Sequence, residues 1–310
     1  MPPAETTDRQ HIDARAAMIM VVLCAVWGTQ QAIVKLAAPD MSATLQMAFR
    51  SGVAAIGVFA LALARGETRW FCRATLVPGL AVGTFFGLEF ALVGEALRYT
   101  SASHVTVYLY SAPILIAVGL GLAHHDERLR PEQWLGVLFS FAGVAVTFLG
   151  RGDPALYPAM HWGDALALGG ACSWAMTAVV LRGSKLANAP AAVTLFYQLV
   201  GAAVLAGVLA LVMGETAVHP ALGLGIALVW QVLVVAFASY LTWFALLRTY
   251  SSARLGVLSF MTPVFGVAGG VILLGDRIDT GFGVGAAMIL GGIVFATTGL
   301  PRRAQPSAVV

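Results

Sequence analysis

Long apolar segments follow one another along almost the whole chain, and they constrain the fold more than any other feature. A helix needs about 20 mainly apolar residues to cross roughly 30 Å of hydrocarbon. Short connections separate ten segments of that kind: 15–37, 43–64, 74–97, 102–123, 131–150, 162–182, 189–213, 221–247, 253–274 and 279–300. The sequence therefore predicts an all-α integral membrane protein with ten transmembrane helices.

The composition supports this assignment, since 59% of the 310 residues are hydrophobic and only 11% are charged. Soluble domains carry about 25% charged residues. The net charge of +3 is small and scattered, which argues against a nucleic-acid-binding surface. The three cysteines show neither a disulfide framework nor a metal-binding spacing. We therefore expect no metal, no cofactor and no nucleic-acid partner, and the lipid bilayer is the expected surrounding.

The distribution of lysine and arginine predicts the orientation in the membrane, because loops on the inner side are enriched in both. With the N-terminus inside, thirteen of the 18 positive side chains fall on the inner side. Arg50 lies within a segment, and four fall outside: Lys35, Arg98, Arg151 and Arg277. We expect an uncleaved first segment and a multi-pass protein of the inner (plasma) membrane. Its cytoplasmic termini would be polar tails, at 1–14 and 301–310.

The two halves of the sequence, 15–150 and 162–300, resemble each other. Shifts of 147 to 150 residues align them in these pairs: Trp27 with Trp174, Arg98 with Arg248, Ser101 with Ser251, Pro113 with Pro263, Glu127 with Asp276, Gly136 with Gly285, and Gly143 with Gly292. Each half contains five segments, so the second half must enter the membrane from the opposite side. Such inverted-topology repeats recur in secondary transporters, which bind substrate near the midplane between the repeats.

With these motifs the chain resembles the drug/metabolite transporter superfamily, in its ten-helix EamA-type branch. The resemblance rests on a Trp after small residues in segments one and six (Trp27, Trp174), and on a Pro followed by an acidic residue in segments four and nine. Glycine-rich fifth and tenth segments complete the pattern, which covers about residues 15–300. The resemblance implies an exporter of small metabolites, commonly amino acids and sometimes aromatic ones. It also implies ion coupling or facilitated diffusion, and no ATP-binding G-x-x-x-x-G-K-[ST] loop is present.

Ionisable residues within apolar segments are costly to bury and are functional candidates for that reason. Glu89 lies near the middle of the third segment, and Arg50 lies about two turns into the second. They form either a structural ion pair or the charged centre of a substrate site. In the second case Arg50 would hold a carboxylate, and Glu89 would meet an ammonium or carry a coupling proton. Lys35 and Glu95 are expected to reach the interface, and His104 to be a polar end residue.

Polar and aromatic residues share helix faces in both halves. Trp27, Gln30 and Gln31 are spaced at i, i+3 and i+4, which places them on one face. We predict a substrate cavity lined by Arg50 and Glu89 and by these polar and aromatic residues: Trp27, Gln30, Gln31, Tyr108, Trp174, Tyr197 and Tyr240. The alternative is helix–helix hydrogen bonding, with Tyr and Trp in the interfacial belt.

Prolines and glycines mark two further features. Pro113 and Pro263 occupy equivalent places in the two halves, so they are either matched bending points or tolerated kinks. Gly79, Gly83 and Gly87 recur every four residues in the third segment. This spacing predicts close packing against another helix.

Other functions fit the sequence less well. A membrane-embedded enzyme would need a catalytic or metal motif, and neither H-E-x-x-H nor G-x-S-x-G occurs. A channel would need a filter loop or a ring of charges. A nucleotide-sugar or phosphate-ester carrier would need several cations facing the cavity, and only Arg50 is well placed. The run His124-His125-Asp126-Glu127 lacks a second ligand cluster, so we expect a solvated loop there. A secondary transporter that exports amino acids or related metabolites by alternating access, possibly with protons, remains the favoured function.

Overall fold

The structure is a computed structural model that describes residues 13–123, 131–149, 156–250, 255, 258–259 and 261–298. In the first half the elements are α1 (Ala14–Leu36), α2 (Ala43–Ala64), η1 (Glu67–Trp70), α3 (Arg73–Tyr99), α4 (Ala102–Leu109), α5 (Ala112–Ala123) and α6 (Pro131–Leu149). In the second half they are α7 (Met160–Arg182), η3 (Lys185–Asn188), α8 (Ala191–Val212), α9 (Leu222–Val229), η4 (Trp230–Ser239), α10 (Tyr240–Thr249), α12 (Thr262–Gly269), η5 (Gly270–Leu274) and α13 (Thr280–Thr298).

Seven helices of the described chain are long and apolar enough to cross a membrane. They span Ala14–Leu36, Ala43–Ala64, Arg73–Tyr99, Ala102–Leu120, Met160–Arg182, Ala191–Val212 and Leu222–Leu246. Shorter apolar helices at Gln133–Val146, Thr262–Leu274 and Thr280–Phe295 fall within the other three predicted segments. The all-helical membrane class is therefore confirmed, and the count of ten crossings stays a prediction.

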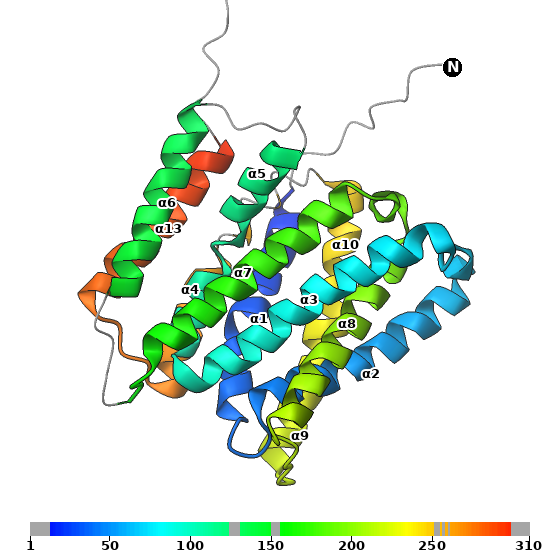
Figure 1. The fold of residues 1–310 in the computed structure, drawn as a ribbon, viewed down its shortest axis with the longest axis horizontal. Helices are drawn as coiled ribbons and strands as arrows, with labels where there is room; N and C mark the ends of the chain where they lie inside the picture. The colour runs from blue at the N-terminus through cyan, green and yellow to red at the C-terminus, as the bar shows by residue number, and fades with distance from the viewer. Residues whose placement is uncertain are drawn as a thin grey trace, which may run out of the picture.

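The helices form a bundle with two ends (Figure 1). We call the end that holds residues 99–101 the Thr100 end, and the opposite end, which holds residues 65–72, the Arg65 end. α1 finishes at the Thr100 end, where the Lys35 ammonium donates to the Thr100 carbonyl. α7 begins there, because Gly163 lies directly against Thr100. The first helices of the two halves therefore run in opposite directions, as an inverted repeat requires.

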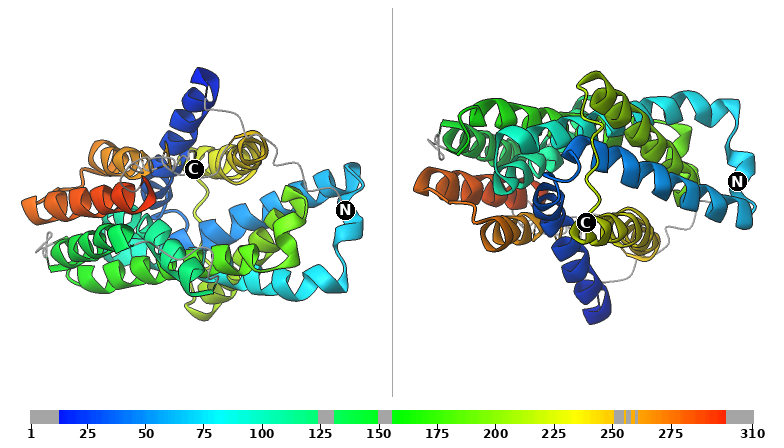
Figure 2. Two further views of the ribbon diagram at one scale, coloured as in Figure 1. Left: turned by 90° about the horizontal axis from the view of Figure 1, so that it is seen from above. Right: turned by 90° about the horizontal axis from the view of Figure 1, so that it is seen from below.

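The pair formed by α6 and α13 reflects the symmetry between the halves. A Cβ atom added at Gly143 would lie 2.7 Å from the Gly285 carbonyl oxygen, and one added at Gly292 would lie 2.5 Å from the Gly136 carbonyl oxygen. In the alignment of the two halves Gly143 pairs with Gly292, and Gly136 pairs with Gly285. The contact of Gly143 with Gly285 is therefore equivalent to the contact of Gly292 with Gly136. This helix pair occupies one side of the molecule, away from α2, α3 and α8 (Figures 1 and 2).

Glycines also bring α3 and α8 together, in the centre of the bundle. Added Cβ atoms would lie 2.5 Å from the Tyr197 carbonyl oxygen at Gly83, and 2.3 Å from the Gly201 carbonyl oxygen at Gly87. Gly79 lies against the Tyr197 ring. The predicted close approach at these three glycines is confirmed, and it places Tyr197 between the two helices. The largest buried apolar cluster lies beside this contact, among α1, α2, α3, α4, α7 and α8.

Both predicted proline positions stand at the start of a helix. Tyr110 and Ser111 separate α4 from α5, directly before Pro113. The Ser111 hydroxyl and the Ser111 backbone N–H both donate to the Tyr108 carbonyl, at 2.7 and 3.0 Å. Pro263 lies in the first turn of α12, where a missing backbone N–H costs little. Whether the two breaks act as bending points stays a prediction.

Candidate substrate cavity

A cavity of about 360 Å³ lies between the two halves of the protein. Helices α1, α3, α4 and α5 line it from the first half, and α7, α8 and α10 line it from the second. Eight of its twenty lining residues are aromatic: Trp27, Phe86, Phe90, Tyr110, Trp174, Tyr240, Trp243 and Phe244. An apolar cavity of this size with a few polar groups is typical of a small-molecule site.

Gln30, Gln31 and Glu89 supply the main polar part of the cavity wall. Only 6%, 2% and 5% of these residues are exposed, respectively. Within the described chain, Gln30 Oε1, Gln31 Oε1 and Glu89 Oε2 have no hydrogen-bond partner. A buried acceptor left without a donor costs about 1–3 kcal/mol. N–H groups of a ligand in the cavity would be suitable donors to these oxygens.

Contacts with each other and with a serine side chain hold several of these aromatic rings in place. The Trp27 indole N–H donates to Ser239 Oγ at 2.8 Å, which ties α1 to η4. The Trp27 ring packs edge-on against Trp243, with centroids 5.6 Å apart. On the opposite wall Trp174 meets Tyr110 edge-on at 5.5 Å. Fixed ring faces of this kind bind apolar groups and also attract ammonium groups.

Arg50 is buried behind the cavity wall and is not among the residues that line the cavity. Its guanidinium carbon lies 4.6 Å from the centroid of the Phe90 ring, which itself faces the cavity. Arg50 also interacts electrostatically with Glu89 and Tyr240. Among the described residues it makes no ion pair within 4.0 Å. Arg50 therefore contacts the back of the cavity wall rather than its interior.

Six of the nine residues predicted to bind substrate line this cavity: Trp27, Gln30, Gln31, Glu89, Trp174 and Tyr240. The other three do not, since Arg50 lies behind Phe90, Tyr197 lies between α3 and α8, and Tyr108 is buried on α4 beside His104. Phe86, Phe90 and Tyr110 also line the cavity, but no polar periodicity in the sequence distinguishes them from residues of an apolar core. That these residues bind substrate stays a prediction.

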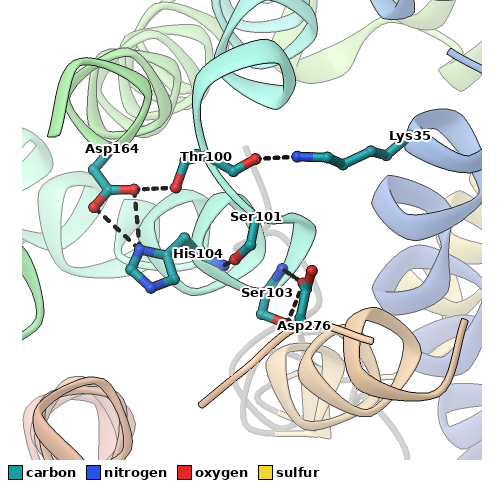
Figure 3. A network of polar contacts seen from close by, with 7 residues as sticks. All are labelled: Lys35, Thr100, Ser101, Ser103, His104, Asp164 and Asp276. Atoms are coloured by element: carbon teal, nitrogen blue, oxygen red, sulfur yellow. Dashed lines mark hydrogen bonds and ion pairs between the residues drawn. The ribbon is translucent and has the colours of Figure 1, made fainter. Parts of the chain in front are cut away.

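A second buried polar group lies at the Thr100 end, and we call it the Thr100 network (Figure 3). Its members are Lys35, Thr100, Ser101, Ser103, His104, Asp164 and Asp276. Asp164 accepts a hydrogen bond from Thr100 Oγ1 at 2.6 Å and lies 3.0 Å from His104 Nδ1. Asp276 Oδ2 accepts from the Ser103 backbone N–H at 3.0 Å and from its hydroxyl at 2.8 Å.

This network corrects one expectation from the sequence. Lys35 is partly exposed, donates to the Thr100 carbonyl and lies over the Tyr157 ring, and its contact with the interface stays a prediction. His104 is not a polar end residue, because it is buried and paired with Asp164. The sequence did contain a signal for Asp164, which is a carboxylate within a predicted apolar segment. The run 124–127 lies outside the described residues.

Two oppositely directed halves around a shared cavity define the class of protein, a helical membrane transporter. Residues 14–149 and 161–298 each match the EamA-like transporter family. The chain therefore belongs to the EamA-like transporter family, which confirms the resemblance seen in the sequence.

Known proteins similar to this chain support the assignment. A protein of Salmonella typhimurium, described as a probable amino-acid metabolite efflux pump, is 25% identical over 300 residues, which cover 94% of this chain and 96% of the relative. One solved crystal structure of a protein matches with a TM-score of 0.64 and 24% identity. That match covers 91% of this chain and 97% of the other, and it supports the fold alone.

Proposed function

We propose that this protein is a secondary transporter that exports amino acids or related small metabolites by alternating access between its two halves. The observation that carries the proposal is the aromatic cavity between the halves, with the unpartnered buried oxygens of Gln30, Gln31 and Glu89 in its wall. The description of the Salmonella typhimurium relative supports the same class of substrate.

An amino acid with an apolar side chain matches the chemistry of this cavity. Its ammonium group would meet the carboxylate of Glu89 and the amide oxygens, and its side chain would lie against the rings of Trp27 and Trp174. The amide N–H groups of Gln30 and Gln31 would donate to the substrate carboxylate. Because Arg50 lies behind Phe90, we assign it an indirect role, through the Phe90 ring and through its field at Glu89.

A carrier of nucleotide sugars or phosphate esters is less well supported. Phosphate groups are bound by arginine and lysine, and the cavity wall in the described part of the chain contains neither. Membership of a transporter family likewise supports transport rather than catalysis.

The position of the cavity along the bundle supports one state of an alternating-access cycle. Its lining runs from the middle of the helices toward the Arg65 end, where Ala178 and Leu181 lie near the end of α7 and Leu195 near the start of α8. The Thr100 network lies at the other end. The asymmetry of lysine and arginine in the sequence favours a cytoplasmic position for the Arg65 end. The structure would then correspond to a state closed to the outside.

Efflux from proteoliposomes preloaded with a panel of labelled amino acids tests the proposal. We expect saturable efflux of a subset of the panel, and a loss of at least tenfold in Trp174→Ala, which removes a ring from the cavity wall. Trp162→Ala is the matched control, because Trp162 lies on the same helix and is exposed. A folded wild-type protein that moves no member of the panel would contradict the proposal, as would equal losses in the two variants.

A further inference from the structure

The contacts of the Thr100 network cross between the two halves of the protein. Thr100, Ser103 and His104 belong to the first half, whereas Asp164 and Asp276 belong to the second. The backbone contacts nearby do the same, since the His219 N–H donates to the Asp40 carbonyl at 2.8 Å. A transporter cannot open at this end while these contacts persist. The network therefore has the position of a closed gate.

The pair of His104 and Asp164 lies at the centre of this gate and is almost fully buried. Asp164 is 1% exposed and His104 is 5% exposed. His104 Nδ1 lies 3.0 and 3.1 Å from the two carboxylate oxygens of Asp164. The imidazole is fixed in orientation, because it stacks on Phe282 of α13 with ring centroids 4.4 Å apart. Ser101 caps α4 by accepting the His104 backbone N–H at 3.1 Å.

A proton on the imidazole would make His104 and Asp164 an ion pair that joins the two halves. Asp164 from α7 and Asp276 from the loop after η5 are both buried carboxylates, and Lys35 from α1 interacts electrostatically with Asp276. The Tyr108 hydroxyl on α4 interacts with Asp164. A buried carboxylate is strongly destabilising without a partner of opposite charge. An imidazolium would supply that partner and strengthen the hydrogen bonds to Asp164.

Further charged or titratable groups lie at this end, among them Arg277 and Asp279 in the loop after η5 and His161 at the start of α7. On α3, Arg98 lies 3.1 Å from Glu95 and 2.5 Å from Glu215 of the α8–α9 connection. The Arg98 side chain is 42% exposed, and exposed ion pairs contribute about 0–1 kcal/mol. Helix α12, which packs against α4, has no titratable side chain. Histidine is the side chain that ordinarily changes charge near neutral pH, and His104 joins the two halves through Asp164.

We propose that His104 and Asp164 form a proton-binding site that controls opening at the Thr100 end. A proton on His104 holds Asp164 and keeps the two halves together, and loss of that proton weakens the contact and allows the end to open. The only covalent change in this step is the formation or breaking of an N–H bond on the His104 imidazole. The site is separate from the substrate cavity, but α4 connects them, because Thr106 and Leu109 on the same short helix line the cavity. This inference rests on the alternating access proposed above.

Distances between spin labels on the full-length protein in nanodiscs test this site without any substrate. Labels at Leu36→Cys and Leu156→Cys, with the native cysteines replaced, flank the contact of Lys35 with Tyr157, and both leucines are exposed. We expect the ratio of open to closed distances to rise about tenfold between pH 5.5 and pH 8, which corresponds to about 1.4 kcal/mol. In His104→Gln the change should be less than twofold.

His219→Gln is the matched control, since this exposed histidine lies at the same end, and it should keep the full pH response. Asp164→Asn is the second variant, and it should lose the response as His104→Gln does. A wild-type ratio that does not change with pH would overturn the proposal, and so would an unchanged response in either network variant. A protein with the expected distances but no efflux would contradict the proposed function and leave the gate supported.

Discussion

The contact between α3 and α8 can be tested with a single added methyl group at Gly201. The Cβ atom of an alanine there would lie 1.9 Å from the Gly83 carbonyl oxygen and 2.3 Å from its carbonyl carbon. Real Cβ atoms essentially never approach heavy atoms closer than 3.0 Å, so the two backbones would have to separate by about 1.1 Å. Both neighbouring atoms belong to the backbone, so no side-chain rotation can relieve the clash.

The expected effect of Gly201→Ala is a large loss of stability. Overpacking of a tight contact costs about 1–3 kcal/mol, and α3 carries Glu89 and Phe90 into the cavity wall, so the displacement would also reach the cavity. The better helix propensity of alanine returns about 1 kcal/mol at most. Because two backbones must move, we take the upper end of the overpacking range and expect a net loss of about 2 kcal/mol. The unfolding midpoint in detergent, followed by tryptophan fluorescence, should fall accordingly.

Gly207→Ala on the same helix is the control for this measurement. A Cβ atom at Gly207 would lie 3.7 Å from the Ala48 Cβ, which is an ordinary contact. This variant should keep or slightly raise the midpoint, because only the helix propensity changes. Equal midpoints for the two variants would refute the reasoning, since the close approach of the α3 and α8 backbones would then carry no energetic weight.

Three further predictions address the cavity and the orientation. Glu89→Gln should fold well but raise the KM for amino acids at least about tenfold, which corresponds to a loss of about 1.4 kcal/mol of binding free energy. A wild-type KM at every pH would contradict the role of Glu89. Gln31→Leu should reduce efflux while raising the unfolding midpoint, because it removes a buried oxygen without a partner; full activity would contradict its role in binding. Backbone hydrogen bonds from Ala74 and Thr75 lower the pKa of the exposed Cys72 thiol, so more of it is reactive thiolate near pH 7. An impermeant maleimide should label it from the cytoplasmic side, and labelling only from the outside would refute the orientation.

The sequence by itself determined the class of this protein and six residues of the cavity wall. Apolar segments of spanning length, with so few charges, leave no alternative to a membrane fold. The aligned prolines, tryptophans and glycines showed the repeat. Trp27, Gln30 and Gln31 could be found because helical periodicity fixes which residues share a face. Glu89 could be found because a carboxylate in an apolar segment is costly to bury and is therefore a functional candidate.

Only the tertiary structure decided what each of these faces contacts. Periodicity places Tyr197 on a face of α8, but only the glycines of α3 show that the ring packs between two helices. Arg50 is as deeply placed in the sequence as Glu89, yet Phe90 separates it from the cavity. His104 and Asp164 are 60 residues apart and meet because α7 begins at the end of the bundle where α4 begins. The physical reason is that hydropathy and helical period act within one segment, whereas pairing of buried charges depends on which helices become neighbours.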